Sequence, residues 1–285
     1  MSLCPCGSAN PASSCCLSSK GFFKPAAITS PRGQRTESRH AKCYGQSLGD
    51  CSSKISREHF VSESLLHELS AMGGLHVSGL RWQSGDGPAS FAPDALASKV
   101  LCDRHNSALS PLDAIAVRLF RSFDELHAAG SEIRVLYLFS GHDVERWLLK
   151  ILCGLVVGKH LSLLASTHVD VPTEWLAILF GNAEFAPGQG LYMPRGVGEV
   201  LAGPTGLVLA PMLVRGNLVG LKALVCGYEL LLSLEAFPGR VLDGRQLVYR
   251  PLELHTVGPA YEKSVLFSWA GPADLGTISV SIAEA

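Results

Sequence analysis

Residues 100–106 read VLCDRHN, and this stretch decides how the central part of the chain folds. Within it, Cys102 and His105 are separated by two residues, which is a usual spacing for two ligands of one zinc ion. Cys43 and Cys51 lie upstream and complete a candidate Cys₃His ligand set. Because zinc binds four such ligands in a tetrahedron, we expect these separate segments to be held around one metal ion.

Polar residues suited to phosphodiester hydrolysis lie beside both halves of this candidate zinc site. Residues 55–60 read ISREHF, which places His59 directly after Glu58, and Asn106 directly follows His105. A neutral imidazole can accept a proton from water near pH 7. The side-chain oxygens of Glu and Asn suit a hard divalent cation that stabilises charge on a phosphate. The pattern therefore favours a hydrolytic site next to a structural zinc ion.

This arrangement resembles the HNH endonuclease family. The ββα-metal motif of that family has an acidic residue and a histidine on a β-hairpin, followed by a CxxC(H/N) sequence that enters a helix. The resemblance covers about residues 43–125. It implies that His59 is the general base, that Asn106 binds or orients the catalytic metal, and that Glu58 is a further candidate metal ligand.

The chain departs from the family's pattern in two places. Seven residues separate Cys43 from Cys51, where two are usual. The middle asparagine expected before Cys102 has no evident counterpart, although Asp94 and Ser98 lie in that region. The first departure leaves open whether both upstream cysteines bind zinc, and the second leaves open whether the site is active.

Three of the candidate site residues also have an alternative role. His59 can be a surface or capping histidine, Asn106 can be a turn or cap residue, and His105 can bind the catalytic metal instead of zinc. Asp113 would lie about 10.5 Å along a helix from Asn106, which is too far to share one ion. Residues 110–113 read SPLD, which predicts a helix start with Asp113 in a structural role.

The N-terminus carries a second, separate group of cysteines. Residues 4–16 read CPCGSANPASSCC, and two close cysteine pairs joined by a short loop can surround one zinc ion. This run resembles the SEC-C motif, a zinc knuckle known at the C-terminus of the preprotein translocase motor. The basic and aromatic residues usual in the loop are absent here, so a docking or stabilising role is favoured over a grip on nucleic acid. The predicted ligands are Cys4, Cys6, Cys15 and Cys16.

Two further stretches have apolar residues at helical spacing. They predict packed helices, with buried faces made of Leu112, Ile115, Ala116, Leu119, Phe120 and Phe123 in the first and of Val144, Trp147, Leu148, Ile151, Leu152 and Leu155 in the second. Glu145, Arg146 and Lys150 lie opposite the second face. A short helix is expected at 173–180.

After residue 190 the pattern changes to strands. Turn sequences predict hairpins that pair 206–214 with 218–226 and 240–242 with 246–249. Alternation of apolar and small polar residues predicts a last strand at 278–282. These strands predict an antiparallel, β-rich C-terminal domain, in which Cys153 and Cys226 are buried thiols.

Composition and charge limit the class of protein. Apolar residues make up 47% and charged residues 17%, which is typical of a globular chain, and the net charge is -1. The first 58 residues contain eight basic and three acidic residues, which weakly favours a polyanionic partner. No apolar run is long enough to span a membrane and no signal peptide is evident, so we expect a cytoplasmic protein whose cysteines bind metal instead of forming disulfides.

Together these patterns predict an α+β protein in four parts. The parts are a zinc knuckle at 1–18, a basic linker at 19–42, an HNH-like nuclease domain at 43–128, and a helix plus β-rich domain of unknown role at 129–285. The predicted function is metal-dependent endonuclease activity, with one or two structural zinc ions and a catalytic Mg²⁺ or other divalent cation. The expected partner is nucleic acid, with DNA favoured, and a protein can also dock on the knuckle or the C-terminal domain. The alternative is a non-catalytic zinc-containing adaptor that binds nucleic acid or protein through a decayed HNH site.

Overall fold

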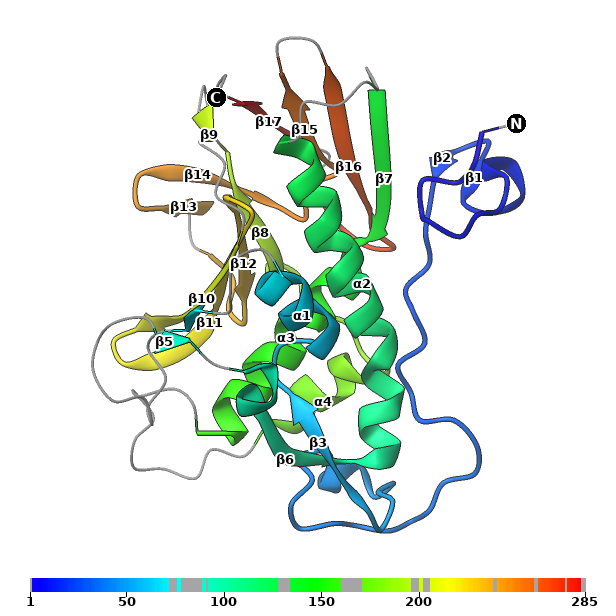
Figure 1. Ribbon diagram of the computed structural model, residues 1–285, viewed down its shortest axis with the longest axis vertical. Helices are drawn as coiled ribbons and strands as arrows, with labels where there is room; N and C mark the ends of the chain where they lie inside the picture. Colours follow the sequence, from blue (N-terminus) through cyan, green and yellow to red (C-terminus); the bar gives the residue numbers. More distant parts are fainter. Residues whose placement is uncertain are drawn as a thin grey trace. The chain divides into compact units, whose positions relative to one another are not determined.

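The structure is a computed structural model (Figure 1). It describes residues 2–71, 76–77, 89–90, 92–127, 134–159, 171–195, 200–201, 206–237, 240–258, 261–274 and 276–282. These residues form both helices and sheets, so the chain has an α+β fold. Among the described residues, no helix is both long and apolar enough to cross a membrane.

The chain divides into two compact units, and neither unit is continuous in sequence. The sheet unit consists of Met1–Ala27, Arg118–Glu145 and Phe185–Ala285, and the hairpin unit consists of Ile28–Val117 and Arg146–Glu184. Two long helices, α2 (Asp103–His127) and α3 (Gly141–Val157), contribute residues to both units. The sequence predicts four consecutive parts with boundaries at residues 18, 42 and 128. The two compact units are built from interleaved segments and do not test these boundaries, which stay a prediction.

The hairpin unit is built on the antiparallel strands β3 (Ile55–His59) and β6 (Ala97–Cys102). Ile55 lies opposite Cys102 and His59 lies opposite Ala97, with a register shift at Arg57. Helix α2 begins at the residue after β6, as Figure 1 shows. The end of β6 and the start of α2 therefore lie next to β3.

Short elements complete the hairpin unit. They are η2 (Gln46–Leu48), α1 (Glu63–Ala71), β4 (His76–Val77), β5 (Ala89–Ser90), η3 (Pro93–Leu96) and α4 (Thr173–Leu179). Strands β4 and β5 pair in antiparallel fashion. Helix α4 confirms the short helix predicted at 173–180.

Helix α2 begins at Asp103, before the start with Ser110 as cap that the SPLD sequence predicts; this agrees with the helix that the resemblance to the CxxC(H/N) motif implies around Asn106. Its first backbone N–H groups are satisfied from a distant segment, since Asp103 donates to the Lys54 carbonyl and Arg104 donates to the Ser52 hydroxyl. Pro111 is accommodated inside the helix. The carbonyl of Ser107, which Pro111 cannot bond, accepts the Ser110 hydroxyl at 2.9 Å instead.

Helix α3 is buried along nearly its whole length, from residue 141 to residue 156. The apolar face predicted for it is buried, but so are Glu145, Arg146 and Lys150 on the opposite side. Charged groups in such a position need partners. Glu145 pairs with Arg250 at 2.8 Å, and Arg146 donates to the Thr29 hydroxyl at 2.8 Å.

The sheet unit contains a six-stranded sheet in which every pairing is antiparallel. Its order is β10 (Leu207–Val214), β11 (Asn217–Val225), β12 (Tyr228–Ser233), β8 (Gly190–Pro194), β14 (Arg245–Tyr249) and β13 (Val241–Leu242). Both predicted hairpins are confirmed. Arg215 and Gly216 both have positive φ, as the tight turn between β10 and β11 requires.

A second, five-stranded sheet in this unit is mixed, which corrects the antiparallel prediction. Its order is β7 (Arg134–Ser140), β16 (Glu262–Ser268), β15 (Glu253–Val257), β17 (Thr277–Ile282) and β9 (Val200–Leu201). Only β15 and β16 pair in antiparallel fashion, while the other three pairings are parallel. Alternating polarity predicts that a segment is a strand but not the direction of its neighbour, because both pairings present side chains with the same period.

Removing one partner of the buried pair of Glu145 and Arg250 should strongly destabilise the protein, because each side chain is only 2% exposed. Replacing Arg250 with Leu is expected to lower the free energy of unfolding by about 3–5 kcal/mol, since Glu145 would stay buried without its counter-charge. Urea denaturation of the zinc-loaded protein measures this loss. As a control, Arg240→Leu removes the exposed pair with Asp274 and should cost less than about 1 kcal/mol. Equal losses for the two variants would contradict the prediction.

Candidate functional site

The hairpin unit brings Cys43, Cys51, Cys102 and His105 together in one buried cluster. The three sulfur atoms lie 3.4, 3.8 and 3.3 Å from Nδ1 of His105, and the four candidate ligand atoms are within 4.8 Å of one another. The long spacing between the first two cysteines does not separate them, because η2 and the left-handed Gly49 turn the chain back between them. Three thiols and one imidazole fit a zinc ion.

His105 is positioned to bind the metal of this cluster and does not line the pocket described below. Burial lowers the pKa of its imidazole, which favours the neutral form that binds metal. Gly45 lies against the ring, and a Cβ atom there would be 3.0 Å from Nδ1. The geometry therefore favours the zinc role of His105 over the alternative role as ligand of a catalytic metal.

The N-terminal cysteines form a second cluster, in the sheet unit. Cys15 Sγ lies 3.6 Å from the sulfur atoms of both Cys6 and Cys16, and all four candidate ligand atoms are within 4.8 Å of one another. Burial opposes ionisation of Cys6, but hydrogen bonds from Ser8 and Cys4 outweigh it and lower its pKa to about 6. This donor set fits a zinc ion bound by four thiolates.

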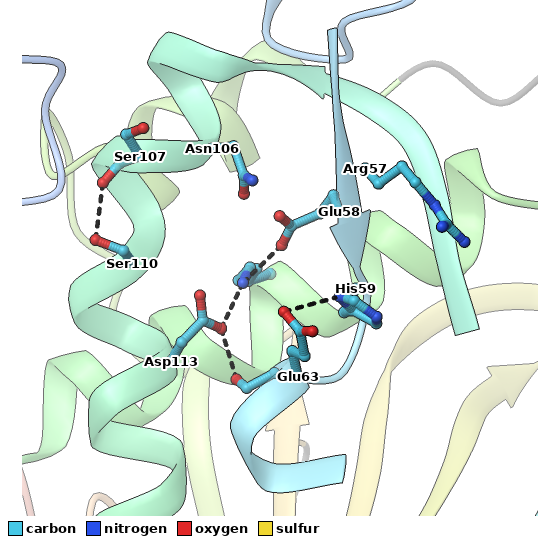
Figure 2. Close-up of a pocket in the computed structure, with 10 residues that line it drawn as sticks. Arg57, Glu58, His59, Glu63, Asn106, Ser107, Ser110 and Asp113 are labelled. Carbon is cyan, nitrogen blue, oxygen red and sulfur yellow. Dashed lines mark hydrogen bonds and ion pairs between the residues drawn. The ribbon is translucent and has the colours of Figure 1, made fainter. Parts of the chain in front are cut away.

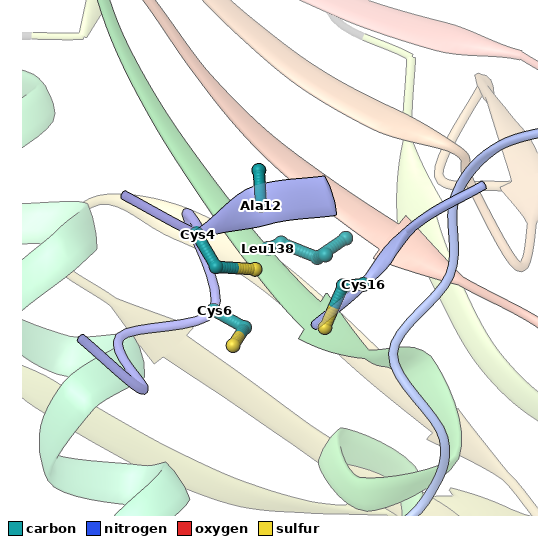
Figure 3. Packing of buried hydrophobic residues seen from close by; sticks show 5 residues of the cluster. All are labelled: Cys4, Cys6, Ala12, Cys16 and Leu138. Atoms are coloured by element: carbon teal, nitrogen blue, oxygen red, sulfur yellow. The ribbon is translucent and has the colours of Figure 1, made fainter. Parts of the chain in front are cut away.

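We refer to residues 4–16 as the N-terminal knuckle. This segment packs against β7, the edge strand of the five-stranded sheet. The side chains of Cys4, Cys6, Ala12 and Cys16 surround Leu138, as Figure 3 shows.

Hydrogen bonds reinforce this packing of the knuckle on β7. The backbone N–H of Leu138 donates to the Pro5 carbonyl at 3.0 Å, and Arg118 donates to the same carbonyl at 2.5 Å. A short hairpin of β1 (Leu17–Ser18) and β2 (Gly21–Phe22) joins the end of the predicted knuckle to the start of the predicted linker. The knuckle is therefore an integral part of the sheet unit.

A polar pocket of about 240 Å³ in the hairpin unit gathers the predicted catalytic residues Glu58, His59 and Asn106 (Figure 2). The first two come from the end of β3, and Asn106 comes from the first turn of α2. Seven other residues complete the lining: Arg57, Ser62, Glu63, Ser107, Ser110, Asp113 and Lys150.

His59 is the last residue of β3 and lies between two carboxylates. Its side chain is 11% exposed, with Nδ1 3.8 Å from Glu63 and Nε2 3.9 Å from Asp94. Burial lowers the pKa of the imidazole, and the two carboxylates oppose this shift without cancelling it. His59 is therefore neutral near pH 7, which suits a base. The same three side chains are close enough to share a metal ion.

The floor of the pocket contains an ion-pair network that the sequence did not reveal. Lys150 Nζ lies 2.6 Å from Glu58 Oε1 and 2.5 Å from Asp113 Oδ1, and Ser62 donates a hydrogen bond to the same Asp113 oxygen at 2.6 Å. Asp113 thus has the structural contacts predicted for it, although it also lines the pocket. The available clue was Lys150 itself, the one charged residue between 147 and 157, which needs a partner if that stretch is buried.

Comparisons of the chain with models of protein families, with characterised proteins and with solved structures found no match.

The two cysteine clusters lead to a prediction about metal content. The purified protein should contain two zinc ions per chain, and Cys51→Ser should reduce this to one, because a hydroxyl is a much poorer zinc ligand than a thiolate. Mass spectrometry under native conditions or elemental analysis measures the stoichiometry. Cys153→Ser is the matched control, since Cys153 is a buried thiol outside both clusters and its loss should leave two ions bound. Full zinc content in the Cys51 variant would contradict the proposed ligand set.

Proposed function

We propose that this chain is a metal-dependent endonuclease of the HNH type that hydrolyses phosphodiester bonds. The observation that carries the proposal is the pocket in which His59, Glu58 and Asn106 meet. The strand and helix that supply them also adjoin Cys102 and His105, so a zinc ion bound there would fix the pocket without taking part in the reaction.

The charge of the pocket supports a role for a divalent cation. Its lining has three carboxylates, from Glu58, Glu63 and Asp113, against two cationic side chains, from Arg57 and Lys150. With His59 neutral, one net negative charge remains, and this charge would repel a phosphodiester. A bound divalent cation would reverse the sign and supply charge stabilisation at the scissile phosphate.

Each predicted residue has a role consistent with its position. His59 would take a proton from the attacking water, because its ring is neutral and lines the pocket. The side-chain oxygens of Asn106 and Glu58 would hold Mg²⁺ or another divalent cation. The substrate is a nucleic acid, with DNA proposed first. We place the protein in a reducing compartment such as the cytoplasm, where seven of its nine cysteines would bind zinc as thiolates instead of forming disulfides.

One observation favours a second candidate, a zinc-containing adaptor that binds nucleic acid or protein without cutting. Glu58 already has a counter-ion, because Lys150 lies 2.6 Å from it. In a decayed site, a lysine would neutralise the carboxylate that once bound the metal ion, as Lys150 does for Glu58. In this case the knuckle and the sheet unit would serve only to dock a partner.

A cleavage assay tests the two candidates directly. Zinc-loaded protein with Mg²⁺ or Mn²⁺ should cut plasmid DNA, and His59→Ala should lower the rate about 10²–10⁴-fold, because the water would lose its base. The zinc content of the variant should stay at two ions per chain. His255→Ala is the control, since His255 lies on β15 and does not line the pocket.

The possible results separate the candidates. Cutting that depends on His59 but not on His255 supports the nuclease. Absence of cutting on DNA and RNA across divalent metals, together with nucleic-acid binding that survives His59→Ala, would support the adaptor and end the nuclease proposal.

A further inference from the structure

Lys150 is the least expected member of the pocket, because it lies on helix α3, outside the region that resembles the HNH motif. Its side chain is 3% exposed, yet its ammonium group reaches two carboxylates, those of Glu58 and Asp113. The Ser62 hydroxyl donates to Asp113 and so fixes the second of these carboxylates. The ammonium group is thereby held in one place on the pocket floor.

The ion pair engages only one end of the Glu58 carboxylate. Oε1 faces Lys150 at 2.6 Å, and Figure 2 shows the other oxygen directed toward the side of the pocket where Asn106 lies. The Glu58 side chain is 6% exposed, so it would be costly to bury as an anion without a counter-charge. The contact with Lys150 thus orients the carboxylate and also makes its charged form tolerable.

We propose that Lys150 is a positioning residue: it holds one oxygen of Glu58 so that the other, together with Asn106, receives the divalent cation. This inference rests on the cation site of the proposed function but not on cleavage itself. The contact between Lys150 and Glu58, which was the observation that favoured a decayed site, is then part of a functional cation site. Asp113 and Ser62 serve as the anchor that keeps Lys150 in place.

A simple electrostatic role for Lys150 predicts the opposite behaviour of the cation site. If Lys150 were only a nearby positive charge, its removal would make the pocket more negative and would tighten cation binding. If Lys150 positions Glu58, its removal weakens cation binding, although the pocket becomes more negative. The sign of the change therefore separates the two roles.

The test measures Mn²⁺ binding to the zinc-loaded full-length protein by electron paramagnetic resonance of free Mn²⁺. Lys150→Met should weaken binding about 10–100-fold, which is the usual effect of losing a residue that orients a metal ligand. Lys150→Arg keeps the charge and the hydrogen bonds, and it should restore much of the affinity. In a Glu58→Gln background, Lys150→Met should cause no further weakening, because the residue acts through Glu58.

Lys150→Met leaves two carboxylates facing one another, so a second variant guards against misfolding. Lys150→Met combined with Asp113→Asn removes one of these negative charges and should show the same loss of Mn²⁺ affinity with normal zinc content. Unchanged or tighter Mn²⁺ binding without Lys150 would overturn the inference, as would equal weakening in the Glu58→Gln background or no Mn²⁺ binding by the unmodified protein. Binding that depends on Lys150 without any cleavage would instead support the inference and refute the nuclease.

Discussion

The convergence of Cys43, Cys51, Cys102 and His105 on one buried point is the constraint on which the hairpin unit depends. These residues come from the segment around η2, from the end of β6 and from the first turn of α2. A metal ion at this point would tie all three segments together, and its binding free energy would contribute to the folding of the unit. Asn106 directly follows the candidate ligand His105, and Glu58 and His59 lie on the strand that pairs with β6, which ends at Cys102, so the cluster helps to position these pocket residues.

The second organising feature is the burial of charge along helix α3. Glu145, Arg146 and Lys150 are each removed from water, and each meets a polar partner distant in sequence. Burying an ion pair costs desolvation that its attraction only partly offsets, so such pairs contribute less to stability than to the choice of one arrangement. In the hairpin unit, that choice sets the position of Lys150 on the pocket floor and hence the orientation of Glu58.

The packing of the N-terminal knuckle in the sheet unit agrees with a stabilising role, one of the two that its sequence favours. Strand β7 lies at the edge of the five-stranded sheet, and an uncovered edge offers unpaired backbone groups to other chains. Pro5 accepts the backbone N–H of Leu138 from this strand, and the cysteine side chains cover the Leu138 side chain. The knuckle thus covers part of the β7 edge of this sheet.

The sequence by itself determined the features that depend on local spacing. The two ligand clusters, the packed faces of α2 and α3, the short helix α4 and the two hairpins of the six-stranded sheet all follow from periodicity, turn residues or cysteine spacing. The three candidate catalytic residues could also be chosen from the sequence, because Glu58 and His59 are adjacent and Asn106 follows a ligand.

Only the tertiary structure decided what depends on partners far apart in the chain. The start of α2 moved to Asp103 because Ser52 and Lys54 satisfy its first N–H groups, and the parallel pairings of the second sheet join segments more than a hundred residues apart in the case of β7 and β16. Lys150 likewise lines the pocket because its partners, Glu58 and Asp113, are far from it in the sequence and are brought to it by the fold. Local sequence specifies which groups a segment offers, but a buried charge or an unpaired strand edge is satisfied by whichever segment the fold brings to it.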